Sequence, residues 1–346
     1  MVPDRDRSPM PAALAEPLRS HRSWPPSSIV SVSIHGYHRR PTPDPAKRVG
    51  LASRIVEAIA ASGWPSIDAV LLPGGFLRLA DPIGHLVEEG RSAALMRRRV
   101  VANLGGLSAH LDPSCTLVAG VDFKPFNRKV GGDQFVAAWR GGDLVALARK
   151  TFPADGDTDD SGPVYPVYED DFADPSRVIT LGSGRRAILL GCYDAFGVRS
   201  LAHPRFANLT AIRLARDRIG TLHRPSMELR RAYLGKWRAM VAHQAPDLAL
   251  VAIHNFIRPG ADGYWQRHGI AGASAALGGV PVIGAAHFNE GLPIFAEQSP
   301  LASIDVPTGH LDEGACRRPH IWRPAASLTI TDADGMPIAV IRRFDL

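Results

Sequence analysis

Apolar and polar residues alternate along the chain in short stretches that predict strands, and segments with the 3.6-residue period of helices separate these stretches. The first predicted strand is SIVSVSIHGY, from Ser28, and a Pro-rich loop then leads to a helix from about Val49. Strands are also predicted over 68–72 and 116–123, with a helical segment over about 83–107 between them. The front part therefore has the order βαβαβ, which is typical of an α/β fold.

Two strand pairs interrupt this order. QFVAAWR and DLVALARK flank a Gly-Gly connector that suits a tight hairpin turn, and the second of these strands ends at Lys150. An acidic loop that contains Glu169 comes next, followed by the pair VITLGSG and RRAILLG. The last strand delivers Cys192 to its carboxyl end, directly before Tyr193.

Helices and strands alternate again after this point. Helices are predicted over 203–220, 226–244 and 263–277, and strands over LALVAIHNF and PVIGAAHFNEG. His254 and His287 lie near the ends of these two strands. A predicted hairpin around an Asp-Gly pair closes the chain. The whole pattern predicts an α/β protein with mixed sheets.

Composition places most of the chain in one domain. The 346 residues are 45% hydrophobic, which suffices for one large core, and we assign residues 28–346 to a single domain. Residues 1–27 hold 6 prolines among arginines and serines, so they cannot bury enough apolar surface to offset their ordering entropy. This segment is predicted to be a disordered extension. The apolar runs are strand-sized, which argues against a membrane protein.

Charge and cysteine content narrow the function classes. Much of the net charge of +6 lies within residues 1–49, and the remainder of the chain is nearly neutral. Arg97, Arg98 and Arg99 are interpreted as the solvated end of a helix, since no interleaved aromatic residues offer bases a stacking platform. We therefore expect no nucleic-acid partner. The 3 cysteines are too few and too scattered for a disulfide framework or a zinc site. They fit a reducing compartment, so the sequence predicts a cytoplasmic protein without a bound metal.

Cys192 and Lys150 are the main candidates for chemistry, since both lie at carboxyl ends of predicted strands, where α/β folds gather binding groups. A cysteine there can act as a nucleophile, and a buried lysine can stabilise negative charge. Each also has a purely structural interpretation. The cysteine can be a small core residue, and the lysine can reach out to water. Local sequence leaves both interpretations open.

From about Ser28 onwards, the order of motifs resembles the nitrilase, or carbon-nitrogen hydrolase, superfamily. That superfamily has a strand ending in Pro-Glu, a later strand ending in Lys, and a strand ending in Cys-Tyr-Asp or a close variant. These motifs fall here on the PG pair at 73–74, on Lys150, and on the CYD motif at 192–194. PDLALVAIHNF, YWQRHGIAGASAALGGVPVIGAAHFNEG and SIDVPTG are similar to the segments that lead to the superfamily's final strands.

The resemblance implies a two-sheet sandwich with outer helices (α-β-β-α), usually paired through a helical interface into a four-layer dimer. A homodimer or higher homo-oligomer is therefore expected. The resemblance also implies a small amide substrate, no cofactor, and a thioester on Cys192 with Lys150 stabilising the oxyanion. Glu169 lies where many members carry a second, positioning glutamate. The residues assigned to substrate binding are Tyr193, His254 and His287.

The main departure from the superfamily is Gly74, which stands at the position of the proton-transferring glutamate. Glycine cannot accept a proton, and loss of a general base lowers a rate by roughly 10²- to 10⁴-fold. The replacement base is left open between Glu169, His254, His287 and the substrate itself. The favoured hypothesis is a divergent carbon-nitrogen hydrolase or acyl transferase. The alternatives are a catalytically impaired pseudo-enzyme that binds a small ligand or a partner protein, and a scaffold that acts through its dimer interface.

Overall fold

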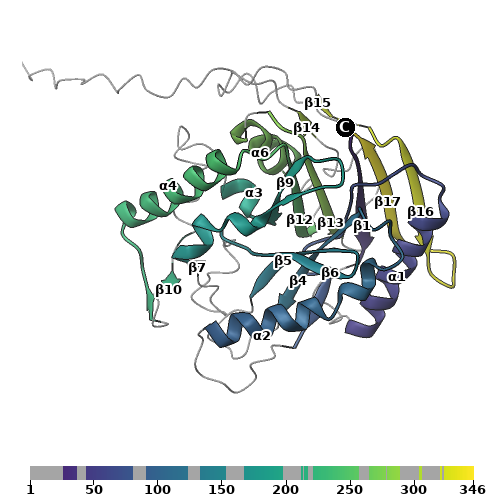
Figure 1. The fold of residues 1–346 in the computed structure, drawn as a ribbon, viewed down its shortest axis with the longest axis horizontal. Helices are drawn as coiled ribbons and strands as arrows, with labels where there is room; N and C mark the ends of the chain where they lie inside the picture. Colours follow the sequence, from purple (N-terminus) through teal and green to yellow (C-terminus); the bar gives the residue numbers. More distant parts are fainter. Residues whose placement is uncertain are drawn as a thin grey trace, which may run out of the picture.

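Figure 1 shows strands in the middle of the molecule and helices on both sides of them. The computed structural model describes residues 26–36, 44–80, 91–123, 133–152, 167–197, 212, 214–216, 221–256, 265–277, 279–288, 304–305, 320–321 and 323–346. The helices are α1 (Pro45–Ala61), α2 (Arg91–Ala102), α3 (Asp194–Gly197), α4 (Met227–Gln244) and α6 (Ala271–Ala276), with 3₁₀ turns at Gly105–Ser108, Glu169–Ala173 and Pro175–Arg177 and a π-helical turn at Trp265–Ile270.

A 12-stranded sheet forms the body of the fold. Its strands are β1 (Ser28–His35), β2 (Ala69–Leu71), β3 (Leu77–Leu79), β4 (Thr116–Phe123), β5 (Gln134–Arg140), β6 (Asp143–Arg149), β8 (Val178–Thr180), β9 (Arg186–Gly191), β12 (Leu248–Phe256), β13 (Val282–Phe288), β16 (Ala326–Thr331) and β17 (Pro337–Asp345). Short strands outside it are β7 (Val167–Tyr168), β10 (Ala215–Arg216), β11 (Leu222–His223), β14 (Ile304–Asp305) and β15 (His320–Ile321).

The strand order is β6-β5-β4-β2-β1-β13-β12-β9-β8, with β17 beside β1, β16 beside β17, and β3 beside β4. Strand β1 pairs with β13 only near their carboxyl ends, at Ile34 with His287 and His35 with Phe288. Side chains from both halves of the sheet meet in one buried cluster, with Val118 from one half and Leu250 from the other. The sheet is therefore folded back on itself into a sandwich.

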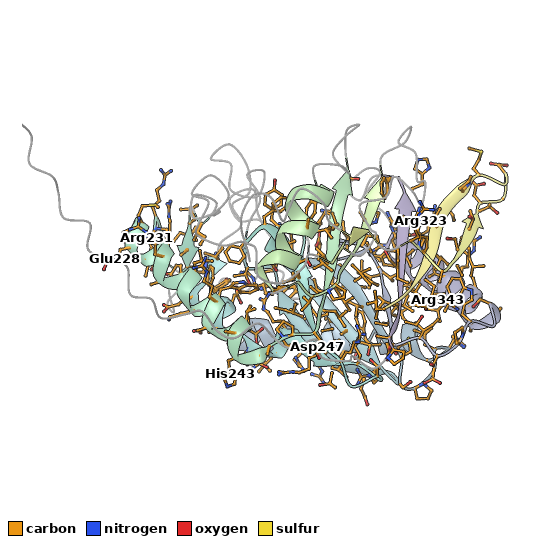
Figure 2. All side chains as sticks on the ribbon, turned by 90° about the horizontal axis from the view of Figure 1, so that it is seen from above. Glu228, Arg231, His243, Asp247, Arg323 and Arg343 are labelled. Carbon is orange, nitrogen blue, oxygen red and sulfur yellow. The ribbon has the colours of Figure 1, made fainter. Side chains whose placement is uncertain are left out.

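Helices cover both outer faces of this sandwich. Apolar residues of α1 and α2 pack on the half that contains β1, β2 and β4, while α3, α4 and α6 pack on the half that contains β9, β12 and β13. Figure 2 shows α4 running from Glu228 to His243 along one side of the molecule, with Asp247 just beyond it at the start of β12. The predicted α-β-β-α architecture is confirmed, and a single chain supplies all four layers.

Parallel pairing sets the position of the candidate site. Strands β4, β2, β1, β13, β12 and β9 are parallel to their neighbours in this series. Their carboxyl ends therefore share one edge of the sandwich, which we call the carboxyl edge. The amino ends of the same strands share the opposite edge, the amino edge.

Local capping explains two helix boundaries. Helix α1 begins at Pro45, earlier than the predicted Val49, because the Asp44 side chain accepts the Ala46 N–H at 3.0 Å and proline suits the first helical position. The predicted helix over 226–244 is confirmed as α4, and the Ser226 hydroxyl accepts the N–H of its third residue, Leu229, at 3.1 Å.

Two other predictions have mixed outcomes. The helix predicted over 203–220 is wrong at 215–216, where β10 pairs with β7 and β11, and residues 203–211 lie outside the described residues. Most of the predicted N-terminal extension also lies outside them, but Ser27 donates its N–H to Leu346 O at 3.3 Å. Within the described ranges, no helix combines the length and apolar character needed to cross a membrane.

Candidate active site

Cys192, His254 and Asp122 come together at the carboxyl edge. Cys192 directly follows β9, His254 lies in the last part of β12, and Asp122 is the last but one residue of β4. Ala252 and Val118 face the interior of the sandwich. Side chains two or four positions further along a strand lie on the same face, so His254 and Asp122 also face inward. The two strands belong to opposite halves of the sandwich, so the residues meet across its interior.

The backbone holds Cys192 in an unusual conformation. Its φ of 43° is in the left-handed region, which residues with a side chain rarely adopt. The Cys192 N–H donates to Ala252 O at 2.9 Å, and the Ala195 N–H donates to Cys192 O at 3.1 Å, so bonds on both sides fix the turn. The residue is 8% exposed. The turn therefore carries the thiol off the end of β9 toward His254.

Cys192 and His254 stabilise each other's charged forms. Burial opposes ionisation of the Cys192 thiol, but hydrogen bonds from the His254 ring and backbone and the charges of His254 and Lys150 outweigh it and lower the thiol pKa. Burial likewise opposes protonation of His254. The charge and hydrogen bond of Asp122, together with Cys192, nevertheless raise the His254 pKa to about 9. Both shifts therefore favour the thiolate form of Cys192 and the imidazolium form of His254.

Asp122 fixes the imidazole ring of His254. Its Oδ1 lies 3.1 Å from His254 Nε2, and both side chains are largely buried. A carboxylate in this position orients the ring and favours its protonated form. A thiol, an imidazole and a carboxylate in this order are the groups that cysteine hydrolases use as nucleophile, base and orienting acid.

The His254 ring fills the space that a side chain at position 74 would need. A Cβ atom on Gly74 would lie 2.6 Å from Ala252 O and 2.8 Å from His254 Nδ1. The neighbouring strand is equally close, since a Cβ on Gly120 would lie 2.3 Å from Gly74 Cα. A glutamate at position 74 and the observed His254 ring therefore exclude each other.

Lys150 completes the charged part of the site. It directly follows β6 and is 2% exposed, and its Nζ donates to Gln134 Oε1 at 2.8 Å. A Cβ on Gly191 would lie 3.1 Å from Lys150 Cβ, so the lysine chain passes close to the strand end that carries Cys192. Its charge contributes to the lowered pKa of Cys192.

Asp194 ties these two strand ends together. Its Oδ1 accepts the N–H groups of Thr151 and Phe152, both at 2.8 Å, and its Oδ2 accepts the Gly191 N–H at 3.0 Å. Arg177 lies 3.5 Å from Asp194 Oδ2 and is fully buried. The aspartate of the Cys-Tyr-Asp motif is therefore a positioning residue that keeps Lys150 beside Cys192.

The structure brings two further predicted residues to this edge. Tyr193 packs against Phe196 and Trp265, with ring centres 4.9 and 6.2 Å away. His287 is fully buried, and its Nδ1 lies 2.9 Å from His254 O. Burial and the charges of Arg48 and His254 hold the His287 pKa well below its ordinary value, so this ring is neutral and supports the backbone of His254.

Glu169 is not brought to the cluster. Its carboxylate forms an ion pair with Lys236 of α4, and both side chains are about half exposed. Asp122 is not among the residues predicted from the sequence. One signal was present in the sequence, because Asp122 follows Val118 and Gly120 on the inward face of an otherwise apolar strand, where an acid is rarely buried without a partner.

The described residues offer no cluster of three or more His, Cys, Asp or Glu side chains that could hold a metal ion. Cys115 is also buried, and burial together with the negative charges of Asp112 and Asp68 raises its pKa to about 12. Cys115 therefore stays a neutral thiol, in contrast with Cys192. Cys316 lies outside the described residues.

No family model matches the chain, and no curated protein does. In structure, the chain is similar to a cysteine-to-alanine variant of a nitrilase-superfamily amidase from Nesterenkonia, with 14% identity, a TM-score of 0.47, and coverage of 92% of this chain and 90% of the other. It is also similar to a glutamate-to-glutamine variant of that amidase, with the acetamide moiety of fluoroacetamide bound covalently to the active-site cysteine. The identity is 16%, the TM-score is 0.47, and the match covers 92% of this chain and 90% of the other. For a carbon-nitrogen hydrolase from Helicobacter pylori, the identity is 11%, the TM-score is 0.44, and the match covers 91% of this chain and 89% of the other.

Proposed function

We propose that the protein is a cysteine-dependent hydrolase or acyl transferase that cleaves the carbon-nitrogen bond of a small amide. Cys192 is the nucleophile, and His254 with Asp122 moves the protons. One observation carries this proposal: Cys192 is hydrogen-bonded to His254, whose Nε2 lies 3.1 Å from Asp122 Oδ1. A purely structural role would not require a thiol, an imidazole and a carboxylate that are hydrogen-bonded one to the next at the edge of a sheet.

In the first half of the reaction, the Cys192 thiolate attacks the amide carbon and forms a carbon-sulfur bond. The carbonyl electron pair moves onto oxygen, and the positive charge of Lys150 stabilises the oxyanion. The oxyanion then collapses, the carbon-nitrogen bond breaks, and the His254 imidazolium gives its proton to the leaving nitrogen. The products of this half are a thioester on Cys192, a free amine or ammonia, and a neutral His254.

In the second half, neutral His254 removes a proton from water or from another acceptor nucleophile, which attacks the thioester carbon. Lys150 again stabilises the oxyanion, and collapse breaks the carbon-sulfur bond. This step releases the acyl product, regenerates the thiolate and leaves His254 protonated. Asp122 stabilises the imidazolium in the free enzyme, before and after each reaction cycle. The site therefore closes its cycle without a carboxylate at position 74.

The His254–Asp122 pair supplies the base that the superfamily's glutamate would provide at position 74. The other candidates for the base do not have this geometry, since Glu169 is paired with Lys236 and His287 is neutral and bonded to the His254 backbone. The hypothesis of an impaired pseudo-enzyme depended on the missing glutamate, and the imidazole ring in its place supports a working site.

Intact-protein mass spectrometry after incubation with a mixed set of small amides, esters and nitriles tests this proposal. The expected result is an acyl adduct that disappears with time, is absent in Cys192→Ala, and persists longer in His254→Ala. Cys115→Ala is the matched control, because it removes a buried thiol outside the site and leaves labelling unchanged. If no adduct forms with any substrate while the folded protein still binds amides, the ligand-binding alternative is correct instead.

A further inference from the structure

Arg48 is a partly buried cation beside the proposed active site. It lies in the first turn of α1, and its guanidinium carbon is 5.6 Å from the centre of the Phe76 ring. Phe76 is fully buried and follows the Gly74–Gly75 turn that packs against His254. The charges of Arg48 and His254 both lower the pKa of His287, which is bonded to the His254 backbone.

The fold itself does not explain this side chain. A cation in the first turn of a helix opposes the helix dipole, and the only acid that the sequence places at this helix end, the N-cap Asp44, bonds to the Ala46 N–H. Within the described ranges, Arg48 has no carboxylate partner and no side-chain hydrogen bond, and its one contact of note is the Phe76 ring. Burial lowers its pKa, which reflects the loss of hydration around the charge.

A guanidinium that has lost part of its hydration is stabilised by an anion that can accept two hydrogen bonds from it. The arginine is also held by the aromatic ring beneath it, which leaves its N–H groups free to orient toward a ligand. The charges of Lys150 and His254 are offset by those of Asp122 and ionised Cys192, so Arg48 adds a net positive charge to this edge, which suits a ligand that carries negative charge.

From these observations we infer that Arg48 binds a carboxylate, so that the substrate is an anionic amide with a carboxylate distal to the carbon-nitrogen bond that is cleaved. This inference rests on the proposed function, because it places the scissile amide at Cys192. Arg48 is then a specificity-determining residue: it selects the substrate and takes no part in the bond changes.

Matched amide pairs test this inference. Succinamate is compared with butyramide, and glutaramate with valeramide, because each pair has the same chain length and differs in one terminal group. A charge-assisted hydrogen bond in a buried site corresponds to a preference of roughly 10- to 100-fold. We therefore expect kcat/KM of the parent protein to favour the carboxylate of at least one pair by that factor. Arg48→Met should abolish the preference, because it should lower kcat/KM for the carboxylate far more than for the neutral amide.

Lys47→Met is the matched control, because it removes the same charge from an exposed neighbour on the same helix and should keep the preference. Arg48→Lys should retain part of it. A parent that prefers the neutral amides, or an Arg48→Met variant that loses both substrates equally, overturns the inference and leaves the proposed function standing.

Binding separates the two proposals if none of the four amides is turned over. Calorimetric titration of Cys192→Ala with succinamate and glutaramate then measures recognition alone. Binding that weakens 10-fold or more on adding Arg48→Met supports the role of Arg48 even without turnover. Binding that is absent, or is the same with and without Arg48, contradicts it.

Discussion

The amino and carboxyl edges of the sandwich each use one aspartate to connect the two halves of the sheet, with different consequences. At the amino edge, Asp68 Oδ2 accepts the Ser27 hydroxyl at 2.6 Å and the Ser28 N–H at 3.1 Å. Its Oδ1 accepts the Ser183 N–H at 2.6 Å. At the carboxyl edge, Asp122 contacts His254 instead.

The partner decides what each aspartate does. A backbone N–H or a serine hydroxyl keeps its charge state at every accessible pH, so Asp68 contributes to stability alone. An imidazole changes its charge near neutral pH, so Asp122 alters the protonation of His254 and, through it, of Cys192. A chemically similar bridge is structural at one edge and controls the protonation of His254 and Cys192 at the other because of the group it holds.

Removal of the proposed nucleophile, at the carboxyl edge, should have the largest effect on activity. Cys192→Ser keeps the size of the side chain but lacks a readily ionised thiol, so kcat/KM should fall by roughly 10⁴-fold or more while the protein stays folded. Steady-state assays and circular dichroism measure the two properties. Retention of more than a tenth of the activity would remove Cys192 from its assigned role.

Loss of the base has the next largest effect. His254→Ala should lower kcat/KM by roughly 10²- to 10⁴-fold.

Asp122→Asn should give a smaller loss of kcat/KM with a distinctive pH dependence. In the parent, activity should fall as pH rises through about 9, where His254 loses its proton. Because Asp122 raises that pKa, the asparagine variant should lose activity at lower pH. If the asparagine variant loses activity at the same alkaline pH as the parent, Asp122 does not act on His254.

A side chain at position 74 should damage the site through its volume. Gly74→Ala places a Cβ within 2.8 Å of His254 Nδ1 and 2.6 Å of Ala252 O, so we expect destabilisation by about 1–3 kcal/mol and a displaced, less active His254. Gly74→Glu should not restore activity in the parent. Combining it with His254→Gly removes the clash with the ring, and thermal unfolding should then show partial recovery relative to Gly74→Glu alone.

The smallest effect on activity is expected at the amino edge. Asp68→Asn weakens three hydrogen bonds and should lower the free energy of unfolding by about 1–3 kcal/mol, measured by urea denaturation. Its kcat/KM should stay within about twofold of the parent. A shifted pH profile in this variant would contradict the division of roles between the two edges.

Much of the fold follows from local sequence patterns. The predicted strand over 116–123 and the hairpin strands around the Gly-Gly turn coincide with β4, β5 and β6. Alternation and turn residues act over a few positions, so they can be read without a structure. The sequence also contains a signal for the start of α1 at Pro45, since an Asp-Pro pair is typical of a helix N-terminus.

The site was harder to predict because its partners are far apart in the chain. His254 and Asp122 are separated by 132 residues and meet only because β12 and β4 face each other across the sandwich. The sequence placed His254 near a strand end but could not choose it over Glu169 or His287. It also could not show that an imidazole fills the space beside Gly74, since that depends on the approach of three strand ends.

The pH dependence of Cys192 alkylation by iodoacetamide tests the central claim most directly. It is measured in a Cys115→Ala background, with peptide mapping to identify the modified thiol. If His254 and Asp122 favour the thiolate form of Cys192, its alkylation should titrate below the ordinary thiol pKa of about 8.5, and His254→Ala should move that titration to higher pH. Titration at or above about 8.5 in the parent, unchanged by His254→Ala, would contradict the account.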